Sequence, residues 1–334
     1  MHLKKYFKKH FLLFSIILAV IILIAIFFNI KHHSDVIYGT SFNPEYAAYL
    51  GLDPKAVYMT ILDDWKFKYI RLPAQWDLIE KVQGKKDFSD LDWMMGEAEK
   101  RGVKIILAVG QKTPRWPECH IPDWAAKLPD AEYKASLSDY ISSVIGRYKN
   151  NPALEIWQVE NEAFLPFGGG CRNFTQNDLK NELSLVKSTD AAHPTMTTDA
   201  GELSLWWRTA NKADLFGFSV YRVVWSQYTG YWSYDWLLPP MGFNTRLWMD
   251  GRSISTAYVT ELQAEPWIPS GVLTSTPVNE QFKSMDINRL KGNIAFASEI
   301  GVSRAYLWGA EWWYWLEKQG NKSFADYIMT LRKQ

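Results

Sequence analysis

The feature that most restricts the fold of this chain is a regular alternation that begins after residue 35. Short runs rich in β-branched and aromatic residues alternate with amphipathic stretches, and no Pro-, Gly- or Ser-rich linker interrupts them. Such runs are typical of strands, and the stretches between them are typical of helices. The eight predicted strands cover residues 36–42, 68–76, 103–110, 154–162, 195–201, 215–223, 256–263 and 303–313.

The clearest predicted helices are 91–102, 130–149, 176–190 and 279–301, of which the first and last end in glycine. Strands that alternate with helices imply a parallel sheet, and eight repeats favour an α/β fold of the (β/α)8 TIM barrel type over an open doubly wound sheet. No G-x-G-x-x-G fingerprint follows the first strand, which weakens the dinucleotide-binding alternative.

One N-terminal transmembrane helix is predicted to precede the barrel. Residues 11–28 are apolar apart from Ser15, and a helix of this length can span a bilayer. Four lysines precede this stretch and one follows it, so the positive-inside rule keeps the N-terminus cytoplasmic. The absence of a small-x-small cleavage site favours an uncleaved signal anchor. The expected organisation is a basic cytoplasmic tail (1–10), a signal anchor (11–30), a short linker (31–35) and an extracytoplasmic catalytic domain (36–334).

The composition is that of a globular chain with a large core. Of the 334 residues, 47% are hydrophobic and 15% aromatic, and the formal net charge is +1. Without the five lysines of the first 33 residues, 32 basic residues face 36 acidic ones, a balance of −4 that argues against nucleic-acid binding. The chain has 17 tryptophans, whose flat rings can stack on sugars or fill the core.

Polar residues cluster at the ends of the predicted strands. The stretch WQVENEAF places Asn161 and Glu162 directly after the fourth strand, and Glu261 closes the seventh. In a (β/α)8 barrel these strand ends meet at the face that carries the active site. The other strand-end candidates for substrate binding are Arg71, Gln111, Asp199, Tyr221, Trp308 and Glu311.

With these motifs the chain resembles the clan A glycoside hydrolases, the retaining (β/α)8 superfamily of cellulases, mannanases and β-galactosidases. The resemblance covers about residues 36 to 330 and rests on "ENE", "YVTELQ", the strand-2 "IRLP", the strand-6 Tyr221 and the strand-8 Trp308. It implies that Glu162 is the acid/base and Glu261 the nucleophile. One departure is Ser219, which stands where many members have a histidine and leaves the family within the superfamily open.

The resemblance also implies a division of labour in cleaving a β-glycosidic bond. Glu162 is expected to be protonated beside the negative Glu261, while Arg71 and Tyr221 keep Glu261 ionised for attack. Asn161 is expected to bind the 2-hydroxyl of the sugar. Glu160 and Glu265 are the competing carboxylates: Glu160 shares a strand face with Glu162, and Glu265 falls in the loop after strand 7.

No metal or cofactor is expected. The sequence lacks H-E-x-x-H and G-x-S-x-G motifs, and four of the six histidines flank the apolar N-terminal segment. Of the other two, His120 falls in a loop that could line the mouth, and His193 looks structural.

The segment 221–243 after strand 6 is rich in aromatic residues, Trp225 among them, and is too irregular for a helix. We expect it to form a stacking wall over the substrate cleft. The alternatives are a loop packed on the barrel by its own aromatics and a surface that touches the membrane.

The two cysteines, Cys119 and Cys171, fall in the loops after strands 3 and 4, which are neighbours in a barrel. Because the domain is expected outside the cytoplasm, we predict a disulfide between them.

The sequence therefore predicts a membrane-anchored, extracytoplasmic retaining glycoside hydrolase with a carbohydrate substrate and a lipid bilayer partner. The alternative from another class is a non-catalytic carbohydrate-binding barrel. An aldolase-like or amidohydrolase barrel is a weaker alternative, because no Schiff-base lysine or metal-binding histidines stand at the strand ends.

Overall fold

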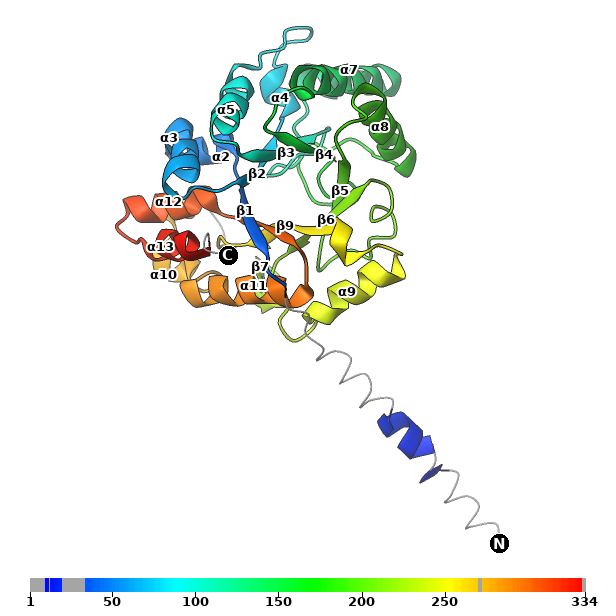
Figure 1. The fold of residues 1–334 in the computed structure, drawn as a ribbon, viewed down its shortest axis with the longest axis vertical. Helices are drawn as coiled ribbons and strands as arrows, with labels where there is room; N and C mark the ends of the chain where they lie inside the picture. Colours follow the sequence, from blue (N-terminus) through cyan, green and yellow to red (C-terminus); the bar gives the residue numbers. More distant parts are fainter. Residues whose placement is uncertain (1–9, 12, 20–33, 270–271, 332–334) are drawn as a thin grey trace.

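The computed structural model describes residues 10–11, 13–19, 34–269 and 272–331. Eight parallel strands form a closed barrel in the order β1-β10-β9-β6-β5-β4-β3-β2. In Figure 1 these strands form a ring surrounded by helices. The barrel strands are β1 (Ile37–Ser41), β2 (Tyr69–Pro73), β3 (Lys104–Val109), β4 (Leu154–Val159), β5 (Thr195–Asp199), β6 (Leu215–Val220), β9 (Ala257–Gln263) and β10 (Arg304–Trp308).

The predicted (β/α)8 barrel is confirmed, and all eight predicted strands are present. Most strands are shorter than predicted, because the chain leaves the sheet to form the loops of the mouth. The last one ends at Trp308, and the predicted strand residues 310–313 instead begin a helix, α12 (Ala310–Lys318).

Helices cover the outside of the barrel, and large apolar side chains fill the space between the two layers. Inside the barrel a second, smaller cluster joins Ile106, Ile156, Met196 and Tyr306. The helices are α2 (Pro44–Tyr49), α3 (Pro54–Met59), α4 (Trp76–Ile79), α5 (Ser89–Lys100), α6 (Asp123–Ala126), α7 (Asp130–Tyr148), α8 (Gln176–Thr189), α9 (Pro240–Met249), α10 (Val278–Gln281), α11 (Ile287–Ile300), α12 and α13 (Ser323–Thr330).

Two helix predictions were wrong. The predicted helix 279–301 is broken into α10 and α11, because Asp286 adopts an extended conformation and its side chain accepts a hydrogen bond from the backbone N–H of Arg289, which caps α11. Between β5 and β6, where the alternation of strands and helices implied a helix, the described residues 200–214 contain none.

The segment after β6 forms an antiparallel hairpin of β7 (Val223–Ser226) and β8 (Gly230–Ser233), followed by α9. The prediction that the segment 221–243 is too irregular for a helix holds up to residue 239, and α9 begins within the segment at Pro240. Trp225 lies on β7 and pairs with Tyr231 of β8, which is followed by Trp232.

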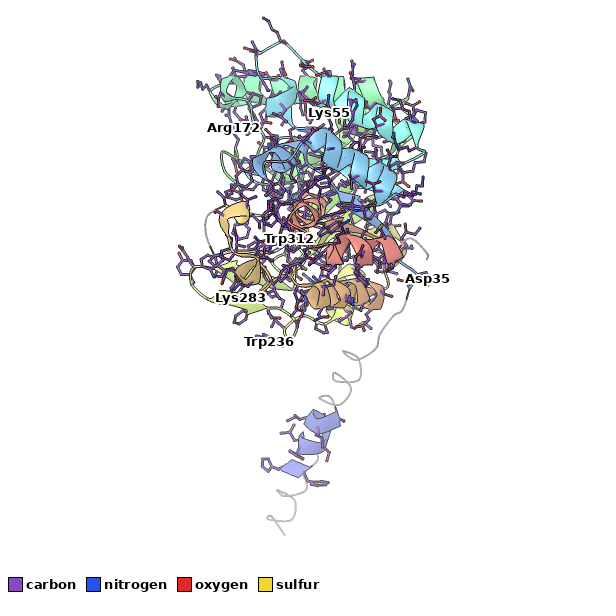
Figure 2. All side chains as sticks on the ribbon, turned by 90° about the vertical axis from the view of Figure 1, so that its left-hand side faces the viewer. Asp35, Lys55, Arg172, Trp236, Lys283 and Trp312 are labelled. Carbon is purple, nitrogen blue, oxygen red and sulfur yellow. A yellow bond between two sulfur atoms is a disulfide. The ribbon has the colours of Figure 1, made fainter. Side chains whose placement is uncertain are left out.

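The two ends of the barrel are identified by residues labelled in Figure 2. Arg172 and Lys283, which follow β4 and β9, lie on one side of the molecule, and Asp35, which precedes β1, lies on the opposite side. Asp35, at the start of the barrel, therefore lies at the end opposite the mouth.

The predicted membrane span, residues 11–30, lies largely outside the described residues. Within the parts of the chain that the structure does describe, none of the helices combines the length and the apolarity that crossing a membrane requires. The described residues 13–19 are helical, and the side chains of Phe11, Leu13 and Phe14 are exposed. The signal anchor remains a prediction from the sequence.

Candidate active site

Glu261 lies near the carboxyl end of β9, where two donors hold its carboxylate. Nη1 of Arg71 donates to Oε1 at 2.8 Å, and the hydroxyl of Tyr221 donates to Oε2 at 2.9 Å. Arg71 comes from β2 and is 1% exposed, and Tyr221 follows β6. A guanidinium and a phenol that donate to both oxygens fix the orientation of the carboxylate.

Arg71 also connects Glu261 to the end of β4. Its Nη2 donates to Oδ1 of Asn161 at 2.5 Å, and its Nε donates to Oε1 of Gln158 at 2.7 Å. One buried guanidinium thus fixes side chains from β4 and β9, which are separated by β5 and β6 on one side of the barrel.

Glu162 lies in the turn after β4. Its backbone N–H donates to the hydroxyl of Thr198 on β5 at 2.9 Å, and its φ of 44° is in the left-handed region. Burial raises the pKa of the Glu162 carboxyl well above its usual range, and the charge of Glu261 raises this pKa further. A hydrogen bond from Ser219 and the charge of Lys112 act in the opposite direction. Glu162 therefore has the electrostatic environment of a proton donor.

A third carboxyl, that of Glu118, lies in the same cluster and was not predicted from the sequence. Its Oε2 accepts a hydrogen bond of 2.8 Å from Nδ2 of Asn161. Burial and the charge of Glu261 raise the pKa of Glu118, and Glu118 in turn raises the pKa of Glu162. A signal for Glu118 was present, because it precedes Cys119, which was expected to be joined to a loop beside Glu162.

Comparisons with known proteins concern the barrel and part of its sequence. A family model for glycosyl hydrolase family 10 matches residues 73–188, a stretch that includes β4 and Glu162 but ends before Glu261. Among solved structures, native xylanase 10B from Thermotoga maritima aligns over 82% of this chain and 83% of its own, with a TM-score of 0.54 and 16% identity. A GH5_18 protein from Bifidobacterium longum subsp. longum, solved with Manb1-4GlcNAc, aligns over 82% of this chain and 68% of its own, with a TM-score of 0.56 and 12% identity.

The chain has the (β/α)8 fold of the clan A glycoside hydrolases. This confirms the resemblance drawn from the strand-end motifs. A mannan endo-1,4-beta-mannosidase F from Aspergillus fumigatus is 25% identical over 121 residues, which are 33% of this chain and 26% of that protein. The chain thus spans about a quarter of the length of this curated relative.

Within this barrel, the Glu160 carboxylate is buried against the backbone of the loop after β3. The carboxylate accepts hydrogen bonds from the backbone N–H groups of Gln111 at 2.7 Å and Lys112 at 2.8 Å. The strand alternation that gave Glu160 and Glu162 a common face does not hold, because β4 ends at Val159 and both glutamates have positive φ. Glu160 therefore holds the loop after β3.

The approach of Glu160 to that loop requires a glycine. Gly110 has a φ of 128°, and a Cβ there would lie 2.3 Å from Oε1 of Glu160. Glu160 also pairs with Glu182 of α8, which donates to it as a neutral carboxyl. Burial raises the pKa of Glu160 to about 7, and burial and Glu160 raise that of Glu182 well above its usual range.

Two side chains predicted to bind substrate form hydrogen bonds within the protein. Gln111 accepts a hydrogen bond of 2.6 Å from the hydroxyl of Tyr133. Asp199 accepts hydrogen bonds from the backbone N–H of Ala200 at 2.9 Å and from the hydroxyl of Thr209 at 2.5 Å. These contacts position the mouth loops, and a substrate contact by either residue remains a prediction.

The predicted residues Trp308 and Glu311 belong to a second polar cluster at the mouth. Nε1 of Trp308 donates to Oε1 of Glu265 at 2.8 Å, and Glu311 accepts from Nη2 of Arg115 at 3.1 Å. Arg115 also pairs with both oxygens of Glu265. Sequence reasoning missed Arg115, which lies 150 residues from Glu265.

Trp225 lies on the β7–β8 hairpin and is partly buried. The more exposed aromatics of this segment are Tyr228 and Trp236, and the rings of Trp232 and Trp236 are 5.8 Å apart. The structure is consistent with a stacking wall, and the roles of these residues remain predictions.

The structure contains the predicted disulfide between Cys119 and Cys171. It joins the loop after β3 to the loop after β4, beside Glu118 and Glu162. No group of His, Cys, Asp and Glu suited to a metal ion occurs among the described residues. The His120 ring instead contacts Gln75 and the backbone oxygen of Arg115.

Proposed function

We propose that this chain is a retaining glycoside hydrolase acting on a β-linked oligo- or polysaccharide, with Glu162 as acid/base and Glu261 as nucleophile. The observation that carries the proposal is the opposite environment of the two glutamates. Glu261 accepts from Arg71 and Tyr221, whereas Glu162 is buried beside negative charge and has a raised pKa. One carboxyl suited to attack and one suited to proton donation are what double displacement requires.

In the first step, an oxygen of Glu261 attacks the anomeric carbon and Glu162 protonates the departing glycosidic oxygen. A covalent glycosyl ester on Glu261 and a free hydroxyl on the leaving group result. In the second step, Glu162, now ionised, takes a proton from water, whose oxygen displaces Glu261. Arg71 and Tyr221 hold the returning carboxylate.

The proteins similar to this chain include a mannan endo-1,4-beta-mannosidase and a xylanase. We therefore propose β-linked mannose or xylose units as the first substrates to test. A panel of 4-nitrophenyl β-glycosides, together with soluble β-mannan and xylan, measures turnover directly.

Covalent trapping tests the assignment of the nucleophile. A 2-deoxy-2-fluoro glycoside of the accepted sugar should label the protein, and peptide mass spectrometry should place the label on Glu261. The Glu261→Gln variant should not be labelled. Glu155→Gln is the matched control, because Glu155 begins β4 at the opposite end of the barrel, where it pairs with Arg304. A barrel that binds these sugars without turnover or label would be the non-catalytic alternative.

We also propose that the chain is a single-pass membrane protein with its N-terminus in the cytoplasm and the barrel outside it. The support is the apolar stretch 11–28 and the lysines that precede it. Protease added to intact cells or spheroplasts that express the full chain should digest the barrel. Complete protection of the barrel would reverse this topology.

A further inference from the structure

We propose that the enzyme removes sugars from a glycan end, because Arg115 closes the glycone side of the mouth. The glycone is the sugar that becomes attached to Glu261. This inference rests on the proposed function and adds the mode of attack, which the comparisons do not establish. The closing element is the β3–α6 loop, defined as residues 110–122 between β3 and α6.

Arg115 is fixed by contacts to elements on the other side of the mouth. Its guanidinium lies 3.6 Å from the ring centroid of Tyr46 and 4.3 Å from that of Trp308, between the two rings. It pairs with both oxygens of Glu265, one of them at 3.0 Å, and with Glu311 at 3.1 Å. The residue is only 7% exposed. A bidentate, stacked and buried arginine is a firm contact rather than a loose surface pair.

Little space remains between Arg115 and the side chains packed around it. Arg71, Arg115, Trp308 and Glu311 line a cavity of about 10 Å³ together with Ser41, Phe42, Asn43 and Pro114. Such a volume holds about one water molecule. The Trp308 ring, expected from the sequence to bind substrate, has Arg115 over one face and is 6% exposed.

Other contacts hold the same loop over the mouth. Glu118 accepts from Asn161 at 2.8 Å, and the disulfide from Cys119 ties the loop to residues after β4. Nζ of Lys112 donates to the backbone oxygens of Glu162 and Leu165, both at 3.1 Å. The loop is thus fastened next to the proposed acid/base as well as across the mouth.

The barrel topology indicates which side of the substrate is closed. Glu162 must reach the leaving-group oxygen, so the leaving group lies on the β4 side of the mouth. β10 is directly across the barrel from β4, with β3, β2 and β1 between them on one side and β5, β6 and β9 on the other. Trp308 ends β10, and Tyr46 follows β1. The glycone therefore points toward Arg115 and its partners.

The β7–β8 hairpin follows β6, which lies midway between β4 and β10 in the barrel order, with β5 and β9 as its neighbours. The β7–β8 hairpin and the residues after it expose Tyr228 (87%) and Trp236 (70%), and Figure 2 shows Trp236 at the edge of the molecule. A chain leaving the site over this side meets aromatic surface, whereas a chain continuing past the glycone meets Arg115. A blind glycone pocket accepts the terminal, non-reducing sugar of a glycan.

The test compares two aryl glycosides that carry the same sugar, a 4-nitrophenyl β-monoside and the matching 4-nitrophenyl β-bioside. With the wild-type chain, the bioside should release free monosaccharide first, and nitrophenol should follow only from the monoside that this step produces. Release of intact disaccharide with nitrophenol in the first turnovers would overturn the inference while leaving the proposed function standing. Hydrolysis of neither compound, across the sugars tested, would overturn the proposed function and the inference with it.

The variant Arg115→Ala tests the residue itself. It should raise the initial release of intact disaccharide from the bioside by about 10-fold or more, since it removes the group that collides with a second sugar. An unchanged product ratio in folded Arg115→Ala protein contradicts the role given to Arg115. The matched control is Arg304→Ala, because Arg304 also stacks on two aromatic rings and pairs with a glutamate, at the far end of the barrel. Circular dichroism checks folding, and the wild-type comparison decides the mode of attack even where a variant does not fold.

Discussion

Arg71 donates a hydrogen bond of 2.8 Å to Glu261 across the mouth of the barrel. The same guanidinium binds Asn161, whose other amide atom binds Glu118. This chain of contacts separates the two proposed catalytic carboxyls into different electrostatic environments. Glu261 faces a fixed cation, and Glu162 faces the charges of Glu261 and Glu118.

The Glu162→Gln variant should lose activity in a way that depends on the leaving group. For unactivated glycosides, turnover should fall by about 10² to 10⁴-fold, because general-acid assistance is lost. The first step with activated 2,4-dinitrophenyl glycosides should fall much less, although the hydrolytic step still lacks its base. Burst kinetics with the two substrate classes measure both steps. Equal losses in the first step for both classes argue against Glu162 as the acid.

The Glu118→Gln variant should move the alkaline limb of the pH–rate profile to lower pH. Glu118 raises the pKa of Glu162, so removing its charge lowers that pKa. Activity requires protonated Glu162 in the first step and is lost as pH rises through this pKa, so the loss begins earlier in the variant. The profile of kcat/KM on a monoside measures the shift. Glu132→Gln, at an exposed position of α7, is the control and should leave the limb in place.

The buried pair of Glu160 and Glu182 should make the fold less stable as pH rises. Burial raises the pKa of Glu160 to about 7, above its value in the unfolded chain, and Glu182 is shifted in the same direction. The folded state therefore binds more protons than the unfolded state. The stabilising contribution of protonated Glu160 is fully present below its pKa in the unfolded chain and is lost as pH rises through its pKa in the folded chain. For Glu160 the loss in the free energy of unfolding is on the order of 3 kcal/mol between about pH 4 and pH 8.

Urea unfolding at a series of pH values measures this effect. In Glu182→Gln the free energy of unfolding should decline less as pH rises, because the amide still donates to Glu160 but carries no proton that titrates. A variant with the same decline as wild type would show that the pair does not share a proton. Glu132→Gln again serves as the control.

Replacing both cysteines with serine should lower the free energy of unfolding. The disulfide joins residues 52 apart, and closing a loop of that length contributes about 4 kcal/mol on the chain-entropy model. Urea unfolding of the Cys119→Ser/Cys171→Ser variant measures the loss. Wild-type protein treated with a thiol reductant should approach the variant, and reduction without effect on stability would contradict the prediction.

The sequence predicted the barrel well because its signals are local. Each strand is a short apolar run, and the order of strands in the barrel follows from their alternation with helices. The break between α10 and α11 was missed because the apolar pattern continues past Asp286, whose capping role depends on backbone conformation.

The site was predicted in part for the same reason. Arg71 and Glu261 lie in β2 and β9, and Glu162 and Tyr221 lie just after β4 and β6, so their strand positions brought them to one mouth. Arg115 and Glu118 belong to a long loop whose path no local pattern reveals. Their partners lie 150 and 43 residues away, at Glu265 and Asn161. Gln111 and Asp199 also lie at strand ends, where they form hydrogen bonds within the protein, and their contact with substrate remains a prediction.

The stereochemistry of the first-formed product tests the central claim most directly. Double displacement through Glu261 inverts the anomeric centre twice, so a β-glycoside must first release the β-anomer of the free sugar. Proton NMR of the anomeric signals, recorded before mutarotation equilibrates them, distinguishes the two anomers. We predict that the β-anomer appears first. Initial release of the α-anomer would contradict the retaining mechanism and the role of Glu261 as nucleophile.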